Sequence, residues 1–270
     1  MRGGRDAFNP CEFLRLFSIS RAGASAGVSL VCRRGSMRSL RFDRVPGLAQ
    51  DISISPEGTP WVVGTNPVGR QGDYGILYWE GRNWVDTRGG GLRIAAGPQG
   101  SACAVNARGE IYLYERQVWT QLPGGAIDAS VGNGGQLCVL GNEQVSQQGD
   151  YGVWHWSGQN WTPLGGGGVR LAIGADGSVW VVNSAGEVWV YQRQTWNGPL
   201  PGLGIDIAAG GDGSVWLIGT NQVSPTGDRG LYRWNGQDWA PMGGGGLNVA
   251  AGPDGRPWVT NAAYEIYCGS

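Results

Sequence analysis

The feature that most constrains this chain is an internal repeat that returns three times, at steps of 77 and then 78 residues. An aspartate, a Gly-Asp pair and a tryptophan mark each period, at Asp51, Asp128 and Asp206, at Gly72-Asp73, Gly149-Asp150 and Gly227-Asp228, and at Trp84, Trp161 and Trp239. A second aromatic series divides each period into two units of unequal length, and its members are Phe42, Trp119 and Trp196. Regular repetition on this scale is typical of propellers and solenoids. The sequence therefore predicts six units.

Each unit contains four short apolar runs separated by turn residues. In one unit the runs are 169–173, 178–182, 187–191 and 196–200, with Asp176-Gly177 and the segment 183–186 between them. Gly and Asn allow the positive φ angles that tight hairpins need, so the runs indicate four antiparallel strands. One such unit buries too little apolar surface to be stable alone, and the units must stack around an axis. We predict an all-β, six-bladed β-propeller of four-stranded antiparallel blades, organised as three double-blade repeats.

The ends of the chain predict how the ring closes. The last unit stops at Ile266-Tyr267-Cys268, after its third strand, while the segment 42–47 matches the outer-strand segment 119–124. We expect residues around 40 to 46 to supply the missing strand, so that an N-terminal strand closes the ring. The propeller then spans residues 38–270. Residues 1–37 form an Arg-rich N-terminal extension that is either disordered or targeting-like.

Charge and composition narrow the function. All 20 basic residues are arginine, which excludes chemistry that needs a lysine. Nine of them fall in residues 1–44 with three acids, whereas residues 45–270 hold 11 arginines against 18 acids. A body of that sign repels phosphate backbones, so nucleic acid is not an expected partner. The chain has no apolar run of the roughly 20 residues that span a membrane, and it is compatible with a monomer.

Targeting and cofactor signals are weak. The segment 11–17 is interrupted by charges and gives no clear secretory signal, which leaves cytoplasmic and non-classically secreted locations open. The five cysteines show no CxxC spacing, so we expect free thiols, no zinc site and no other metal or cofactor.

No catalytic centre is predicted. The single histidine, His155, aligns with Tyr78 and Arg233 of the other repeats, a variety that is typical of a solvent-facing position. A glycoside hydrolase needs only two carboxylates, and this remains a third hypothesis. The acids recur in every unit, however, whereas a catalytic pair is normally unique. We therefore expect a protein that is not an enzyme.

One face of the predicted ring carries the candidate ligand-binding residues. The hairpins between second and third strands and the glycine-rich links between units emerge on that face, where glycine allows a ligand to approach the backbone. Every hairpin carries an asparagine followed by an acid, and the long hairpins add a tyrosine or an arginine. These groups hydrogen-bond to sugar hydroxyls and pack against sugar C–H surfaces, although the same residues also stabilise turns. The candidates are Asn66, Asp73, Tyr74, Asn106, Glu110, Asn142, Asp150, Tyr151, Asn183, Glu187, Asn221, Asp228, Arg229, Asn261 and Glu265.

Two segments carry a family resemblance. Residues 119–128, Trp-Thr-Gln-Leu-Pro-Gly-Gly-Ala-Ile-Asp, and 177–183, Gly-Ser-Val-Trp-Val-Val-Asn, resemble the recurring unit of the tectonin family of β-propeller lectins. The resemblance covers about residues 42 to 268. It implies binding of glycans, neutral or methylated sugars among them, at microbial or cell surfaces, and a role in innate defence. Cys103 and Cys138 stand where four other units have tryptophan, so the family's sites do not transfer uniformly.

Two functional hypotheses follow. The first is a non-catalytic, multivalent carbohydrate-binding protein, a lectin, in which several weak sites gain avidity on a repetitive surface. The alternative is a β-propeller scaffold for protein–protein interaction. A lectin of this kind should present three or six similar pockets, whereas a scaffold should present one asymmetric patch.

Overall fold

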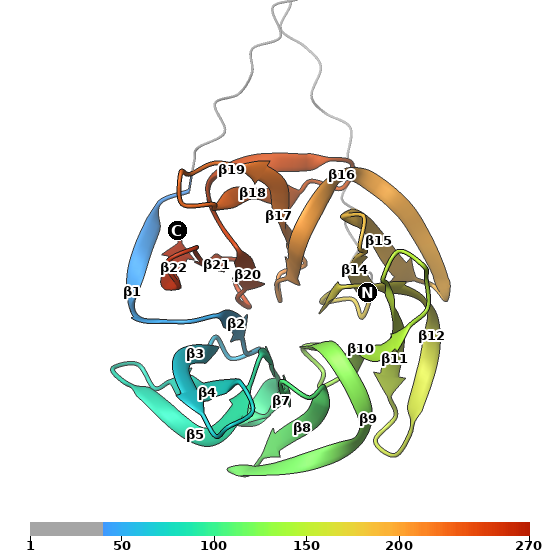
Figure 1. Ribbon diagram of the computed structural model, residues 1–270. Coiled ribbons are helices and arrows are strands. Elements are labelled where there is room, and N and C mark those ends of the chain that lie inside the picture. Colours follow the sequence, from blue (N-terminus) through green and yellow to red (C-terminus); the bar gives the residue numbers. More distant parts are fainter. Residues whose placement is uncertain (1–39) are drawn as a thin grey trace, which may run out of the picture. The chain divides into compact units, whose positions relative to one another are not determined.

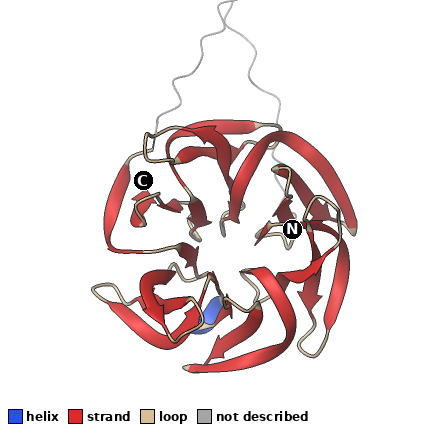
Figure 2. Cartoon of the chain, in the orientation of Figure 1, coloured by secondary structure: helices blue, strands red, loops and turns tan. Residues whose placement is uncertain are grey.

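The computed structural model describes residues 40–270, which form antiparallel β-sheets arranged around a central axis (Figures 1 and 2). The fold is a β-propeller, as the repeat predicts, and within residues 40–270 its regular elements are strands apart from one short 3-10 turn. The expected extension, residues 1–37, lies outside the described residues. Within residues 40–270 no helix has the length and apolar character needed to cross a membrane.

The described strands form four hydrogen-bonded sheets. The first consists of β2 (Asp51–Ile54), β3 (Pro60–Val68), β4 (Asp73–Trp79) and β5 (Trp84–Gly91). The second consists of β6 (Arg93–Ala96), β7 (Ala102–Val105), β8 (Glu110–Glu115), β9 (Val118–Val131), β10 (Leu137–Gln144), β11 (Tyr151–Trp156) and β12 (Trp161–Gly168), with a short 3-10 turn, η1 (Pro98–Gly100), between β6 and β7.

The third sheet consists of β13 (Arg170–Ile173), β14 (Val179–Val182), β15 (Glu187–Gln192), β16 (Thr195–Ala209), β17 (Val215–Gln222), β18 (Arg229–Trp234) and β19 (Trp239–Gly246). The fourth consists of β20 (Asn248–Ala251), β21 (Pro257–Thr260), β22 (Glu265–Gly269) and β1 (Phe42–Leu48).

Strands β9 and β16 are long because each belongs to two consecutive units. Residues 118–125 of β9 pair with β8, and residues 126–131 pair with β10. Residues 195–203 of β16 likewise pair with β15, and residues 204–209 pair with β17. The outer strand of one unit therefore continues directly into the inner strand of the next, and two units appear as one seven-stranded sheet.

The two ends of the described chain pair with each other. Strand β1 runs antiparallel to β22, with Phe42 opposite Gly269 and Val45 opposite Ile266. Beyond the strands, the N–H of Ser270 donates to the carbonyl of Arg41 at 2.8 Å. Residues more than 200 positions apart in the sequence are thus joined in one sheet, as Figure 1 shows for the blue and red segments.

The core lies between neighbouring units and is rich in aromatic side chains. Trp61 of β3 is 2% exposed and contacts Tyr114 of the next unit, with ring centroids 5.6 Å apart. On the outer strands, Trp84, Trp161 and Trp239 each pack against a third-strand tryptophan at centroid distances of 5.1, 4.8 and 5.0 Å. The Trp61–Tyr114 contact buries apolar surface between two units, whereas each of the three tryptophan pairs packs within its own unit.

The glycine-rich links serve packing between units. An outer-strand aromatic ring of the next unit lies against a glycine of each link, in the pairs Gly47–Trp84, Gly89–Trp119, Gly124–Trp161, Gly166–Trp196, Gly202–Trp239 and Gly244–Phe42. A Cβ at Gly166 would stand 2.6 Å from the Trp196 ring, and one at Gly244 would stand 2.8 Å from Phe42. At these positions a protein side chain, not a ligand, makes the close approach that glycine allows.

Candidate functional site

The three short hairpins use their asparagine and acid to close the turn. In the first, Asn106 Oδ1 accepts the N–H groups of Arg108 and Glu110 at 3.0 and 2.9 Å, while its Nδ2 donates to the Glu110 carboxylate at 2.7 Å. The same amide-to-carboxylate bond joins Asn183 to Glu187 at 2.8 Å and Asn261 to Glu265 at 3.0 Å. Six of the predicted ligand-binding residues therefore bond to one another inside their own hairpins.

The acids of the long hairpins bind the following unit instead. The Oδ1 atoms of Asp73, Asp150 and Asp228 each accept a backbone N–H of the next hairpin at 2.7 Å, from Ala107, Ser184 and Ala262 respectively. Burial opposes ionisation of Asp150, but hydrogen bonds from Ser184 and Ser146 outweigh it and lower the pKa of this carboxyl. These aspartates hold neighbouring units together.

The remaining predicted residues differ in exposure and in whether their side chains form hydrogen bonds. Asn66 and Asn142 are exposed and make no side-chain hydrogen bond among the described residues, whereas Asn221 accepts the Tyr232 hydroxyl at 2.9 Å. Tyr74 and Tyr151 are half-buried and pack against apolar clusters. Arg229 donates to the carbonyl of Thr220.

One predicted residue, Asn142, lines a pocket with two tryptophans, which we call the aromatic pocket. It lies between the third unit and the link that precedes it and has a volume of about 300 Å³. Trp161 is fixed in place because its indole N–H donates to the carbonyl of Pro123 at 2.7 Å. Trp154 stands on β11 at the position of Leu77 on β4 and Tyr232 on β18. Sequence comparison of the three repeats at this position would have found it.

A second pocket, of about 430 Å³, lies between β5 and the second unit. We call it the charged pocket, and its residues depart from the repeat at four positions. Arg88 replaces glycine, Arg108 replaces alanine, Asp86 replaces proline and Gly69 replaces serine, relative to both other repeats. The predicted residues Asp73 and Asn106 also line it.

Arg88 adopts a backbone conformation that favours glycine. Its φ is 59°, in the left-handed region, and the equivalent residues Gly165 and Gly243 have φ of 69° and 75°. The Asp86 carboxylate accepts the Arg88 N–H at 2.8 Å and so supports the turn. An L-residue costs on the order of 1 kcal/mol more than glycine in this region, and the chain carries that cost where it places a guanidinium at the pocket.

Gly69 also changes the hydrogen bonding of the Asp73 carboxylate. In the other two long hairpins Ser146 and Ser224 donate to the second aspartate oxygen, both at 2.8 Å. Asp73 has no such hydroxyl beside it, and its Oδ2 makes no hydrogen bond within residues 40–270. The charged pocket therefore offers a polar ligand the Oδ2 atom of Asp73 and the Arg88 guanidinium, whereas the Arg108 guanidinium donates to the Glu110 carboxylate at 2.7 Å.

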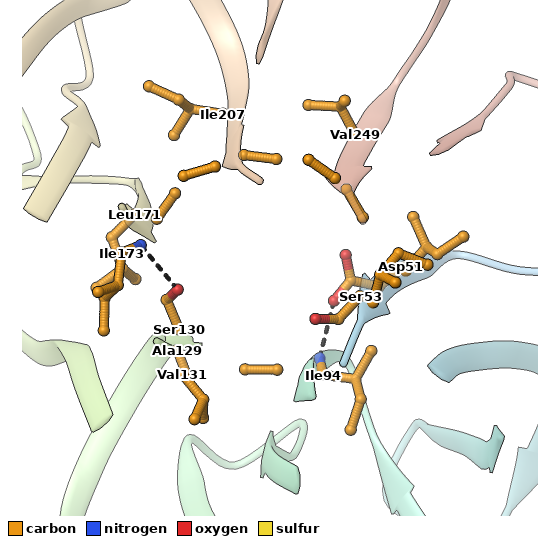
Figure 3. A pocket seen from close by; sticks show the side chains of 18 of the residues that line it. Asp51, Ser53, Ile94, Ala129, Ser130, Val131, Leu171, Ile173, Ile207 and Val249 are labelled. Carbon is orange, nitrogen blue, oxygen red and sulfur yellow. Dashed lines mark hydrogen bonds between the residues drawn. The ribbon is translucent and has the colours of Figure 1, made fainter. Parts of the chain in front are cut away.

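Sequence reasoning missed a set of charged residues at the centre of the propeller, which we call the central ring. It consists of the residues at equivalent positions of the six inner strands, namely Asp51, Arg93, Asp128, Arg170, Asp206 and Asn248. Each aspartate Oδ2 accepts an inner-strand N–H of the next unit, from Ile94 at 2.8 Å, Leu171 at 3.1 Å and Val249 at 2.7 Å. Figure 3 shows the first of these bonds beside the central cavity.

Burial dominates the electrostatics of the central ring. It raises the pKa of Asp51 to about 6 and that of Asp206 to about 7, although Arg93 and Arg170 counteract the rise. Arg93 lies 3.6 Å from Asp51 and 4.0 Å from Asp128, and Arg170 lies 3.6 Å from Asp206. The sequence alone identifies these three aspartates only as markers of the repeat.

Thiols and metal-binding residues add no further site in the described part of the chain. Cys103, Cys138 and Cys268 are free, as expected, and the other two cysteines lie outside it. Residues 40–270 contain no group of three or more His, Cys, Asp or Glu side chains arranged to hold a metal ion.

Comparison with known proteins supports the fold. A scan against models of protein families found no match, and a search of curated proteins found no relative. A solved structure titled "Streptogramin B lyase structure" aligns with 86% of this chain and 98% of its own, at 13% identity and a TM-score of 0.54. Another, titled "YCF48 bound to D1 peptide", aligns with 86% of this chain and 82% of its own, at 17% identity and a TM-score of 0.49. The first likeness supports a shared β-propeller architecture.

Proposed function

We propose that the chain is a six-bladed propeller that binds carbohydrates without catalysis, as the resemblance to tectonin lectins implies. Each sequence unit then makes one blade, with β9 and β16 shared between blades. Strand β1 serves as the outer strand of the last blade, which its pairing with β22 supports. On this proposal the blades act as a rigid frame, and specificity resides in the pockets between them.

The aromatic pocket is the observation that carries the proposal. Trp154 and Trp161 are half-buried there, and the exposed Asn142 has an amide with no hydrogen-bond partner among the described residues. An indole face packs against the C–H surface of a sugar, while an amide both donates to and accepts from hydroxyl groups. Among the described residues that line it, Glu143 is the only charged one. A neutral or methylated sugar suits that chemistry.

The pockets are not equivalent, which limits multivalency. At the positions of Trp154, the other repeats have Leu77 and Tyr232, and the Tyr232 hydroxyl is already bonded to Asn221. We therefore propose one main sugar site at the aromatic pocket. The charged pocket serves a more polar sugar, because Arg88 and the free oxygen of Asp73 lie there.

A glycan array with the full chain tests this proposal, with Trp154→Leu as the diagnostic variant. Leucine occupies the equivalent position in β4, so this variant should fold. We expect saturable binding of one sugar class by the wild type and at least a tenfold loss in Trp154→Leu, or about 1.4 kcal/mol. Tyr232→Leu is the matched control and should keep binding. Absence of binding across neutral, acidic and methylated glycans would overturn the proposal.

A protein-interaction scaffold is the second candidate, and one observation favours it. Of the eight exposed large apolar residues within residues 40–270, seven belong to hairpins and links of the same face: Leu48, Val68, Leu92, Val145, Leu203, Val223 and Tyr264. Exposed apolar residues that gather on one face are typical of interaction surfaces. A partner that competes with sugar for this face, or binds when every glycan fails, would support the scaffold.

A further inference from the structure

The central ring breaks its own pattern at one position. In two repeats an aspartate is followed by an arginine in the next unit, as in Asp51 with Arg93 and Asp128 with Arg170. In the third repeat, Asp206 is followed by Asn248. The ring therefore has three acids and two bases, and the missing base belongs between Asp206 and Asp51.

The backbone hydrogen bond next to the substituted position is retained. Asp206 accepts the N–H of Val249 at 2.7 Å, just as the other two aspartates hold the following unit. Asn248 does not replace the arginine, because its amide donates to the carbonyl of Gln50 at 2.8 Å and to the Thr260 hydroxyl at 2.9 Å. On the Asn248 side, Asp206 and Asp51 thus have no basic neighbour among the described residues.

These carboxylates are costly to leave unpaired. Asp51 and Asp206 are only 9% and 8% exposed. The Oδ1 atom of each is approached by one arginine at 3.6 Å, which is beyond hydrogen-bond distance. The Arg170 Nε is itself buried and has no hydrogen-bond partner in the described part of the chain. A buried acid that lacks a full set of partners strongly favours a cation placed beside it.

Two cavities lie along the axis of the propeller, and Arg93 and Arg170 line both of them. A cavity of about 90 Å³ is lined by Asp51, Asp206 and the inner strands, and Figure 3 shows side chains arranged around it. A wider cavity of about 600 Å³ is lined by Asn248, Arg93, Arg170 and Tyr264. Tyr264 has a φ of 63°, where the equivalent Gly109 and Gly186 have 76° and 81°. The sixth unit therefore departs from the repeat both at the ring and in the lining of the wider cavity.

We propose that the central ring binds the guanidinium group of a ligand beside Asn248, between the carboxylates of Asp206 and Asp51. A guanidinium fits because arginine side chains occupy the two equivalent positions of the ring. Its planar set of N–H donors can address two carboxylates at once. This site is independent of the sugar-binding pockets, so either proposal can fail alone.

Calorimetric titration of the full chain with propylguanidinium tests the proposal, at pH 8, which is above the pKa of about 6 for Asp51 and of about 7 for Asp206. We expect saturable binding at one site. Propylurea, which has a similar shape and no charge, should not bind. Asn248→Arg supplies the missing guanidinium from the chain itself and should weaken binding at least tenfold. Equal affinity in Asn248→Arg and wild type, or no saturable binding by the wild type, would overturn the proposal.

A pair of charge-removing variants keeps the test decisive if Asn248→Arg does not fold. Asp206→Asn and Asp128→Asn each keep an oxygen that can accept the backbone N–H of the next unit. Asp206 borders the proposed site, whereas Asp128 lies between two arginines. We expect a loss of affinity of about tenfold or more in Asp206→Asn and a clearly smaller change in Asp128→Asn. Equal losses in the two variants would contradict the proposed location.

Discussion

The central ring carries one aspartate per repeat, and so does the face formed by the hairpins between second and third strands, which we call the hairpin face. In both places that aspartate accepts a backbone N–H of the next unit. Asp128 binds Leu171 in the ring, and Asp150 binds Ser184 on the hairpin face. Their electrostatics are opposite, because burial raises the pKa of Asp128 while hydrogen bonds lower that of Asp150. One structural role therefore gives two opposite dependences of stability on pH.

The largest expected effect is a loss of stability as the ring aspartates ionise. The pKa of Asp206 rises from 3.8 to about 7 on folding, and that of Asp51 rises to about 6. Because the folded state holds these protons more tightly, their contribution is complete below about pH 4 and is lost as the pH rises to about 7. At about 1.4 kcal/mol per pKa unit, the loss for Asp206 is on the order of 4 kcal/mol.

Urea unfolding between pH 4.5 and 8 measures this loss, and Asn248→Arg isolates it. The variant supplies a cation beside both carboxylates and should flatten the decline, whereas the wild type should lose stability over this range. The same slope in both proteins would show that the missing arginine does not control the titration of the ring.

On the hairpin face, Asp150→Ala should destabilise the protein by about 2 kcal/mol, since it removes hydrogen bonds from Ser184 and Ser146 to a charged group. Asp73→Ala should cost less, because Gly69 provides no hydroxyl to Asp73. Equilibrium unfolding at pH 7 compares the two variants. A larger cost for Asp73→Ala would contradict the roles assigned to these aspartates.

Arg88→Gly should stabilise the protein by about 1 kcal/mol, because glycine adopts the left-handed conformation at that position without strain. The same variant should lose binding of any polar sugar at the charged pocket. Thermal unfolding and glycan binding are measured together. Unchanged binding combined with higher stability would mean that the guanidinium does not serve the pocket.

The smallest expected effect on stability separates two asparagines. Asn183→Ala removes three hydrogen bonds of a short hairpin and should cost about 1 to 2 kcal/mol. Asn142→Ala removes none among the described residues and should change stability by less than about 0.5 kcal/mol, yet it should weaken sugar binding. The free energy of unfolding and the sugar affinity are measured for both variants. A larger loss of stability in Asn142→Ala than in Asn183→Ala, or unchanged sugar binding by Asn142→Ala, would contradict these roles.

The number of residues between the asparagine and the acid explains why this pair behaves differently in the short and the long hairpins. In the short hairpins Asn106 and Glu110 are four residues apart, which lets the amide cap the turn and reach the carboxylate. In the long hairpins the asparagine and the acid are seven or eight residues apart, as in Asn142 and Asp150, so the acid binds the next unit and does not bond to the asparagine. The sequence predicted both residue types at both places. It did not predict which of these side chains would form hydrogen bonds within their own hairpin.

The strands could be predicted because the repeat displays each of them several times. The central ring could not be recognised as easily, since Asp51 and Arg93 belong to units of different length and only stacking brings them together. The aromatic pocket depends on Trp154, a single departure at a position occupied by Leu77 and Tyr232 elsewhere. Features shared by the repeats predicted the frame, whereas the sites arise where one repeat differs.

A crystal structure with the sugar selected on the glycan array tests the central claim most directly. The account predicts a sugar ring in the aromatic pocket, with its C–H face against Trp154 or Trp161 and a hydroxyl hydrogen-bonded to the Asn142 amide. A sugar bound at another place on the propeller, with this pocket empty, would contradict the account.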